Sequence, residues 1–84
     1  MVRNEEKCLE VQGLLARYKE EYNLSQRNLA EYLGVNQRVV YLWNIGRFSP
    51  NDENFDKLRE IPLLLAGRNV KYRGQALDIL MGRE

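Results

Sequence analysis

Residues 26–42, QRNLAEYLGVNQRVVYL, decide the fold of this chain, because they hold two short helical patterns separated by one turn that contains glycine. Apolar residues recur at helical spacing in both halves: Leu29, Ala30 and Leu33 in the first, Val39, Val40 and Trp43 in and just after the second. Gly34 stands where the first helix must end, because glycine adopts the left-handed conformation of that position without steric cost. Asn36 offers a side-chain oxygen that can cap the next helix. The stretch predicts a helix-turn-helix unit at about residues 25–45.

Apolar patterns on both sides of this unit predict three further helices. The first runs over about residues 8–22, with Val11, Leu14, Leu15, Tyr18 and Tyr22 at helical spacing, and Asn23 closes it in the left-handed region. The next begins with Asn51 or Asp52 as cap and carries Phe55, Leu58 and Ile61 on its apolar face. The last, at about residues 74–82, presents Ala76, Leu77, Leu80 and Met81 on one side. No segment shows the alternation of a strand, so we expect an all-α, compact five-helix domain.

Three features bear on the boundaries of these helices. Pro62 would remove a hydrogen bond and clash inside a helix, so we expect a kink or a fresh start there, giving five or six helices. Ser25 should cap the second helix, but Asn28 stands where a full capping box has Glu or Gln. Residues 1–7 are polar, and we expect them to be frayed.

Length and composition indicate one domain over residues 1–84, since 84 residues leave no room for a second core. The lone Cys8 excludes an intrachain disulfide, and the absence of His excludes the usual Cys/His zinc patterns. The beginning of the chain lacks the apolar region of a secretion signal, and the longest aliphatic run, residues 63–66, is too short to span a bilayer. We expect a soluble protein of the cytoplasm without membrane contact.

The residues that enzymes use are scarce. There is no His and no glycine-rich phosphate loop, and Cys8 has no base beside it in sequence. Neighbouring acids such as Glu5 and Glu6 are typical of a solvated helix surface. We expect no enzyme activity, no cofactor, no metal and no small-molecule ligand.

Charge is distributed unevenly although the net charge is only +1. Residues 25–50 carry Arg27, Arg38 and Arg47 against Glu31 alone, a local charge of +2, whereas the flanking segments are close to neutral. The motif is therefore the basic part of the chain, which permits nucleic-acid binding with a modest electrostatic contribution.

The spacing of residues within the motif is more specific than the mere presence of two helices and a glycine turn. Small Ala30 stands where the two helices must cross, Gly34 follows four residues later, and Val35 fills the angle between them. Residues 24–26, LSQ, precede the first helix, and residues 43–47, WNIGR, follow the second. Over roughly residues 14–61 this arrangement resembles the Cro/phage-repressor (Xre-like) family of helix-turn-helix domains. The resemblance implies a lambda-repressor-like fold and a sequence-specific regulator of transcription. Such a protein binds double-stranded DNA, acts as a repressor by occupying an operator as a homodimer, and is nucleoid-associated when bound.

The resemblance also implies which residues meet DNA. The family's base-reading positions fall on Asn36, Gln37, Arg38, Tyr41 and Leu42. Gln37 matches a glutamine that contacts adenine, the Arg38 guanidinium suits guanine O6 and N7, and Leu42 can touch a thymine methyl. Candidate phosphate contacts are Gln26, Arg27, Asn44, Arg47, Ser49 and Asn51. The family's glutamine at position 26 also braces the one at 37, and Arg47 is the strongest phosphate candidate by family position. The alternative is that these are ordinary exposed helix residues, with Arg27 a solvated arginine.

Departures from the family pattern keep other functions open. Asn44 stands where most members have an acid, Val39 stands where they have a small polar residue, and Leu42 and Ile45 make the second motif helix more apolar. An exposed apolar face can serve protein contact. A protein-interaction module or an antitoxin-like regulator is thus the second hypothesis, and a recombination accessory factor is the third. The last helix and residues 63–65 can form the homodimer surface, or that helix can simply cover the core.

Overall fold

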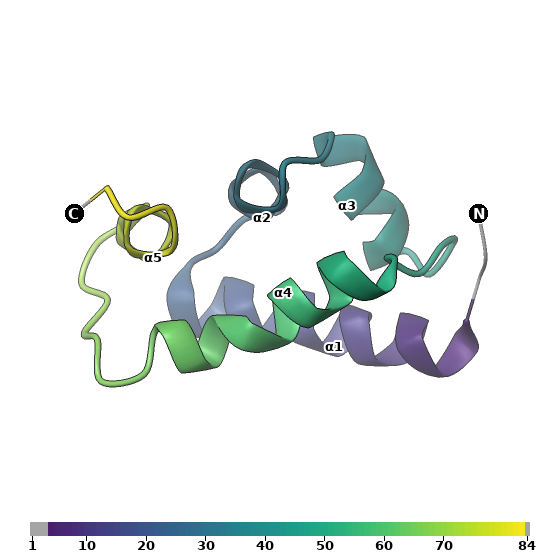
Figure 1. The fold of residues 1–84 in the computed structure, drawn as a ribbon, viewed down its shortest axis with the longest axis horizontal. Helices are drawn as coiled ribbons and strands as arrows, with labels where there is room; N and C mark the ends of the chain where they lie inside the picture. The colour runs from purple at the N-terminus through teal and green to yellow at the C-terminus, as the bar shows by residue number, and fades with distance from the viewer. Residues whose placement is uncertain (1–3, 84) are drawn as a thin grey trace.

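Five α-helices make up the regular structure of residues 4–83, the part of the chain that the computed structural model describes (Figure 1). They are α1 (Glu5–Tyr22), α2 (Gln26–Leu33), α3 (Gln37–Asn44), α4 (Asp52–Leu64) and α5 (Gln75–Leu80). The expected all-α, five-helix fold is confirmed. None of the helices in this part of the chain is long and apolar enough to cross a membrane.

Helix α1 begins earlier than its apolar pattern predicts. The Asn4 side-chain oxygen accepts the backbone N–H of Lys7 at 3.1 Å, and this cap starts the helix at Glu5 rather than at Cys8. Glu5 and Glu6 lie in the first turn, where carboxylates interact favourably with the helix dipole. The prediction of fraying is therefore wrong for residues 4–7, and its remainder, residues 1–3, lies outside the described part. Cys8 is buried, with 2% of its surface exposed.

The caps of α2 and α3 follow from local sequence. Ser25 Oγ accepts the Asn28 N–H, and Asn28 Oδ1 accepts the Ser25 N–H, both at 3.1 Å. The capping box is thus complete, because the shorter amide of Asn28 reaches the same N–H that Glu or Gln would. Gly34 has φ 72° and ends α2 as predicted, and the Val35 N–H donates to the Ala30 carbonyl. Asn36 caps α3 through the Arg38 N–H at 2.8 Å.

Helix α4 continues through Pro62, so the alternative of a fresh start there, with a sixth helix, is wrong. A proline at this position has no N–H for the carbonyl of Leu58, four residues earlier. That carbonyl is buried, and it accepts a hydrogen bond from the Tyr18 hydroxyl of α1 at 2.7 Å. The bond that proline removes from α4 is replaced by one from a neighbouring helix, so the helix need not break.

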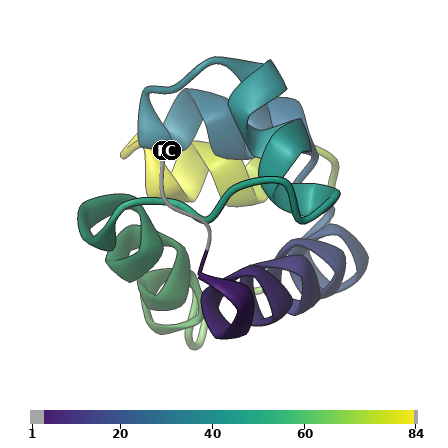
Figure 2. The same cartoon turned by 90° about the vertical axis from the view of Figure 1, so that its right-hand side faces the viewer.

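The helices form two layers around one core (Figures 1 and 2). α1 and α4 lie side by side in one layer, and α2, α3 and α5 form the other. The buried cluster draws on all five helices and includes Tyr18, Leu29, Val40, Trp43, Leu58, Ile61, Ala76 and Leu77. Ala76 and Leu77 of α5 and the nearby Leu65 are at most 6% exposed, so they cover the core and are not available as a dimer surface.

Candidate nucleic-acid interface

Helix α3 presents one face to solvent while the opposite face anchors it. Val40 is fully buried and Trp43 is 2% exposed, and both belong to the core cluster. Figure 1 shows α3 at the upper edge of the molecule, beside α2 and above α1. Because two bulky side chains hold its inner face, the outer face keeps a fixed orientation.

The residues predicted to contact bases differ in how far their side chains are exposed on this outer face. Asn36, Gln37, Arg38 and Tyr41 are exposed, whereas Leu42 is half-buried. Asn36 uses its side-chain oxygen to cap α3, which leaves only its amide nitrogen as a donor. Gln37 and Arg38 lie in the first turn, the part of a recognition helix that approaches base edges.

A cavity of about 450 Å³ lies between α1, α2 and the inner flank of α3. Its lining includes Lys19, Gln26, Arg27, Gln37 and Asn44 above a floor of Leu15, Leu24 and Leu29. Gln26 and Gln37 therefore face the same hollow, although no hydrogen bond joins their side chains within the described structure. Sequence reasoning missed Lys19, whose one local signal was its place in the last turn of α1, just before α2.

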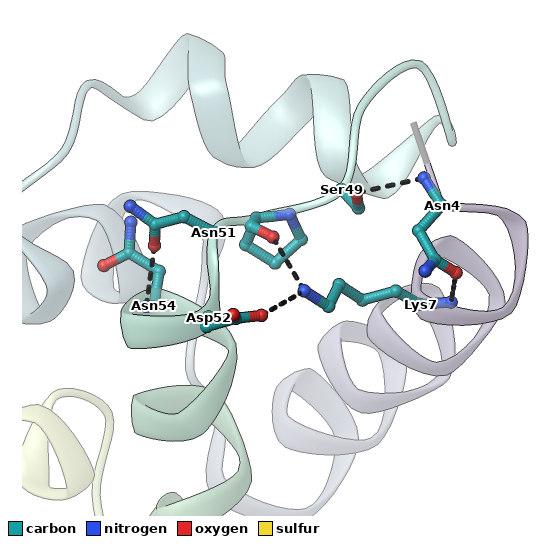
Figure 3. Close-up of polar contacts among 7 residues, drawn as sticks. Asn4, Lys7, Ser49, Asn51, Asp52 and Asn54 are labelled. Carbon is teal, nitrogen blue, oxygen red and sulfur yellow. Dashed lines mark hydrogen bonds and ion pairs between the residues drawn. The ribbon is translucent and has the colours of Figure 1, made fainter. Parts of the chain in front are cut away.

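A second cavity, of about 490 Å³, lies on the other flank of α3. Two predicted phosphate contacts, Ser49 and Asn51, line it, and both have structural partners there (Figure 3). Ser49 Oγ accepts the Asn4 N–H at 3.2 Å, and the Asn51 side-chain oxygen accepts the Asn54 N–H at 2.9 Å as the cap of α4. The structure thus separates these two residues from Gln26, Arg27 and Asn44, which line the first cavity.

Ion pairing leaves positive charge concentrated around α2 and α3. Several basic residues are matched by carboxylates, in the pairs Lys7–Asp52, Arg17–Glu21, Lys57–Glu53, Arg59–Glu10 and Arg83–Glu31. The last pair, at 2.9 Å, compensates the one acidic residue of the motif. The basic residues of 4–83 without an ion pair are Lys19, Arg27, Arg38 and Arg47, together with Lys71 and Arg73 beside the acidic end of α1. Four of these six surround the motif.

Within residues 4–83, no group of three or more Cys, Asp or Glu side chains is placed to hold a metal ion. Within the same residues, burial raises the pKa of the Tyr18 phenol to about 12. Lys7 hydrogen-bonds Asp52 and lowers the pKa of that carboxyl, which keeps the pair charged. These shifts belong to side chains that hold helices together.

Comparison with known proteins yields no relative: no family model, no curated protein and no solved structure matches the chain. The likeness to Cro/phage-repressor domains therefore rests on the motif residues themselves and on the spacing between them.

Proposed function

We propose that this chain is a sequence-specific double-stranded DNA-binding domain of the Cro/phage-repressor type. It regulates transcription in the cytoplasm by occupying an operator, and it binds as a homodimer without a cofactor. One observation carries the proposal: the exposed first turn of α3 holds Gln37 and Arg38, and Lys19 and Arg27, which have no ion pair in the described structure, line a cavity with Gln37. A surface helix without a binding role would not require exposed polar side chains next to cations that lack ion pairs.

The shape of α3 suits the major groove. An α-helix with its side chains is about 10–12 Å across, and the major groove of B-DNA is about 12 Å wide. The Arg38 guanidinium has the donor geometry for guanine, and the Gln37 amide has the donor and acceptor for adenine. Neither side chain is committed to another residue in the described structure, so both are available for base edges.

Phosphate contacts come from the flanks of the motif. Lys19 and Arg27 line the cavity at the start of α2, and Arg47 follows the end of α3. The N–H groups at the start of α2 add a partial positive charge toward the same cavity. Contacts of this kind fix the position of a protein on DNA without reading its sequence.

A second candidate function, contact with a protein partner, is favoured by one feature of α3. Tyr41 and Ile45 lie one turn apart and are each 45% exposed, so they form an apolar ridge on the outer face. A protein-interaction module or an antitoxin-like regulator would use this ridge. Protein contact accounts for this ridge but not for the cations of the motif that lack ion pairs, which DNA binding explains.

A salt titration of binding to random-sequence duplex DNA tests the proposal. The three flanking cations Lys19, Arg27 and Arg47 can meet phosphates, so log K should fall with log salt with a slope of about −2 to −3 for each bound protomer. The variant Lys57→Ala is the control, because Lys57 lies on α4 and is paired with Glu53; its slope should equal that of the wild type. A folded protein with no measurable DNA binding at low salt would reject the proposal and leave protein contact.

A further inference from the structure

The carboxyl end of α3 is held by a side chain from α1. The Gln12 amide nitrogen donates to the carbonyl of Asn44, the last residue of α3, at 2.9 Å. Carbonyls at a helix end lack partners within the helix, so this bond satisfies a group that would otherwise need water. Gln12 is half-buried, and a methyl group added at Gly46 would lie 3.2 Å from its amide nitrogen. Gln12 therefore both bonds and packs against the residues that leave α3.

These contacts bear on the backbone of Arg47. Gly46 has φ 77°, and its N–H donates to the Trp43 carbonyl, while the Arg47 N–H donates to the Leu42 carbonyl at 2.9 Å. This pair of bonds is the Schellman arrangement, in which the residue after the glycine is tied back to the helix. Gln12 joins this turn to α1, so the direction in which Arg47 leaves α3 is set relative to a second helix.

The far end of the α3–α4 loop, residues 45–51, is fastened to α1 as well (Figure 3). Lys7 Nζ reaches Asp52 at 2.8 Å and the Pro50 carbonyl at 3.5 Å, and it lies 5.0 Å from the centre of the Phe55 ring. The Asn4 N–H donates to Ser49 at 3.2 Å. Helix α1 thus holds the loop at both ends, and Arg47 lies in the span between them.

We infer that Gln12 is a positioning residue for DNA binding: it fixes the α3 exit so that the exposed Arg47 side chain is directed to a backbone phosphate. This inference rests on the proposed function. A loop that is already ordered loses less conformational entropy when its side chain binds. A phosphate contact of Arg47 therefore contributes more binding free energy than the same contact from a mobile loop.

The test is a double-mutant cycle between Gln12 and Arg47. Gln12→Met keeps the length and neutral charge of the side chain but removes the donor. On random-sequence duplex DNA at low salt, this variant should lose about threefold to tenfold in affinity, the usual range for one neutral hydrogen bond. In an Arg47→Ala background, the same substitution should change affinity by less than about twofold, because the residue through which Gln12 acts is absent. Gln75→Met is the matched control, since the Gln75 side chain also hydrogen-bonds backbone outside its own helix, by accepting the Lys71 N–H, but it lies in α5.

Amide hydrogen exchange without DNA supplies the readout that a general loss of stability would not reproduce. Exchange at Gly46 and Arg47 should rise in Gln12→Met while that of buried α3 residues such as Val40 stays unchanged. Equal losses of affinity in both backgrounds, or unchanged exchange at Gly46 and Arg47, would overturn the inference. Absence of DNA binding by the wild type would instead defeat the proposed function, so the two failures are distinguishable.

Discussion

Among single residues, Tyr18 has one role that follows from its local sequence and one that does not. Its position in the apolar stripe of α1 predicts burial, and it is fully buried. Its hydroxyl, however, serves the Leu58 carbonyl that Pro62 leaves without an N–H donor. Rules that consider only neighbouring residues predict a kink or a fresh start at Pro62. They cannot foresee the hydroxyl that replaces the lost hydrogen bond, because it comes from Tyr18, 40 residues away from Leu58 in sequence.

Replacing Tyr18 by Phe should therefore cost about 1–3 kcal/mol of unfolding free energy, because the buried Leu58 carbonyl is left unsatisfied. The substitution Pro62→Ala supplies an N–H to that carbonyl within α4. In the Pro62→Ala background, the cost of Tyr18→Phe should be clearly smaller. Urea denaturation of the four proteins measures this coupling, and equal costs in both backgrounds would show that the hydroxyl does not compensate for Pro62.

Tyr18 also predicts a pH dependence. Burial raises its pKa from 10.0 to about 12. The unfolded chain loses this proton near pH 10 while the folded chain retains it, so the contribution to stability is complete below pH 10 and falls as the pH rises toward 12. Between these limits the wild type should lose about 1–3 kcal/mol more than Tyr18→Phe. Parallel stability curves for the two proteins over this pH range would contradict the buried, protonated phenol.

Among the helices, the boundaries set by local capping were readable from sequence. Asn23, Gly34 and Asn36 were each predicted at a helix end and are found there. The start of α1 was missed because its first turn is polar, so the apolar pattern gives no sign of it, although Asn4 is an ordinary cap. The capping role of Asn28 was undervalued because the rule for position N3 favours the longer Glu and Gln.

In the candidate site, too, some features follow from the sequence and others only from the packing of the helices. The exposure of Gln37 and Arg38 follows from helical periodicity once Val40 and Trp43 are assigned to the core. Lys19 and Gln12 escaped notice because they lie on α1, and only the packing of α1 against α3 brings them to the motif. Asn51 caps α4, one of the two caps expected from the sequence, whereas the bond that Ser49 accepts from Asn4, 45 residues away, is not visible in the spacing.

The orientation of α3 depends on its buried face, which gives a prediction at this scale. Trp43→Ala should lower the unfolding free energy by about 3–5 kcal/mol and Leu33→Ala by about 2–5 kcal/mol, since both remove large buried side chains. Tyr41→Ala, on the exposed face of the same helix, is the control and should change stability by less than about 0.5 kcal/mol. Thermal melts measure these losses. A melting temperature of Trp43→Ala within error of that of the wild type would show that Trp43 is not part of the core.

For the whole molecule, the burial of Ala76, Leu77 and Leu65 narrows the predicted dimer surface. The apolar side chains that stay exposed near the ends of α4 and α5 are Leu63 at 76%, Leu64 at 47% and Met81 at 40%. A homodimer formed through this end of the molecule would use these three residues.

We predict that the protein occupies a pseudo-palindromic operator whose half-sites are about one helical turn apart. Leu63→Ser should leave thermal stability nearly unchanged, since that side chain is mostly exposed, but should weaken operator binding at low protein concentration. Footprinting measures both the symmetry and the concentration dependence. One short asymmetric footprint at saturating protein would exclude the dimer.

The claim that α3 reads base sequence rests on the difference between Arg38, in its first turn, and Arg47, beyond its end. The most direct measurement selects preferred sites from random duplexes and compares the wild type with Arg38→Ala and Arg47→Ala. We predict that Arg38→Ala loses about 1–3 kcal/mol on the best site and relaxes preference at one or two base pairs. Arg47→Ala should weaken all sequences nearly equally and flatten the salt dependence by about one contact. An equal loss for Arg38→Ala on selected and random DNA, with base preference unchanged, would contradict the assignment of α3 as the reading helix.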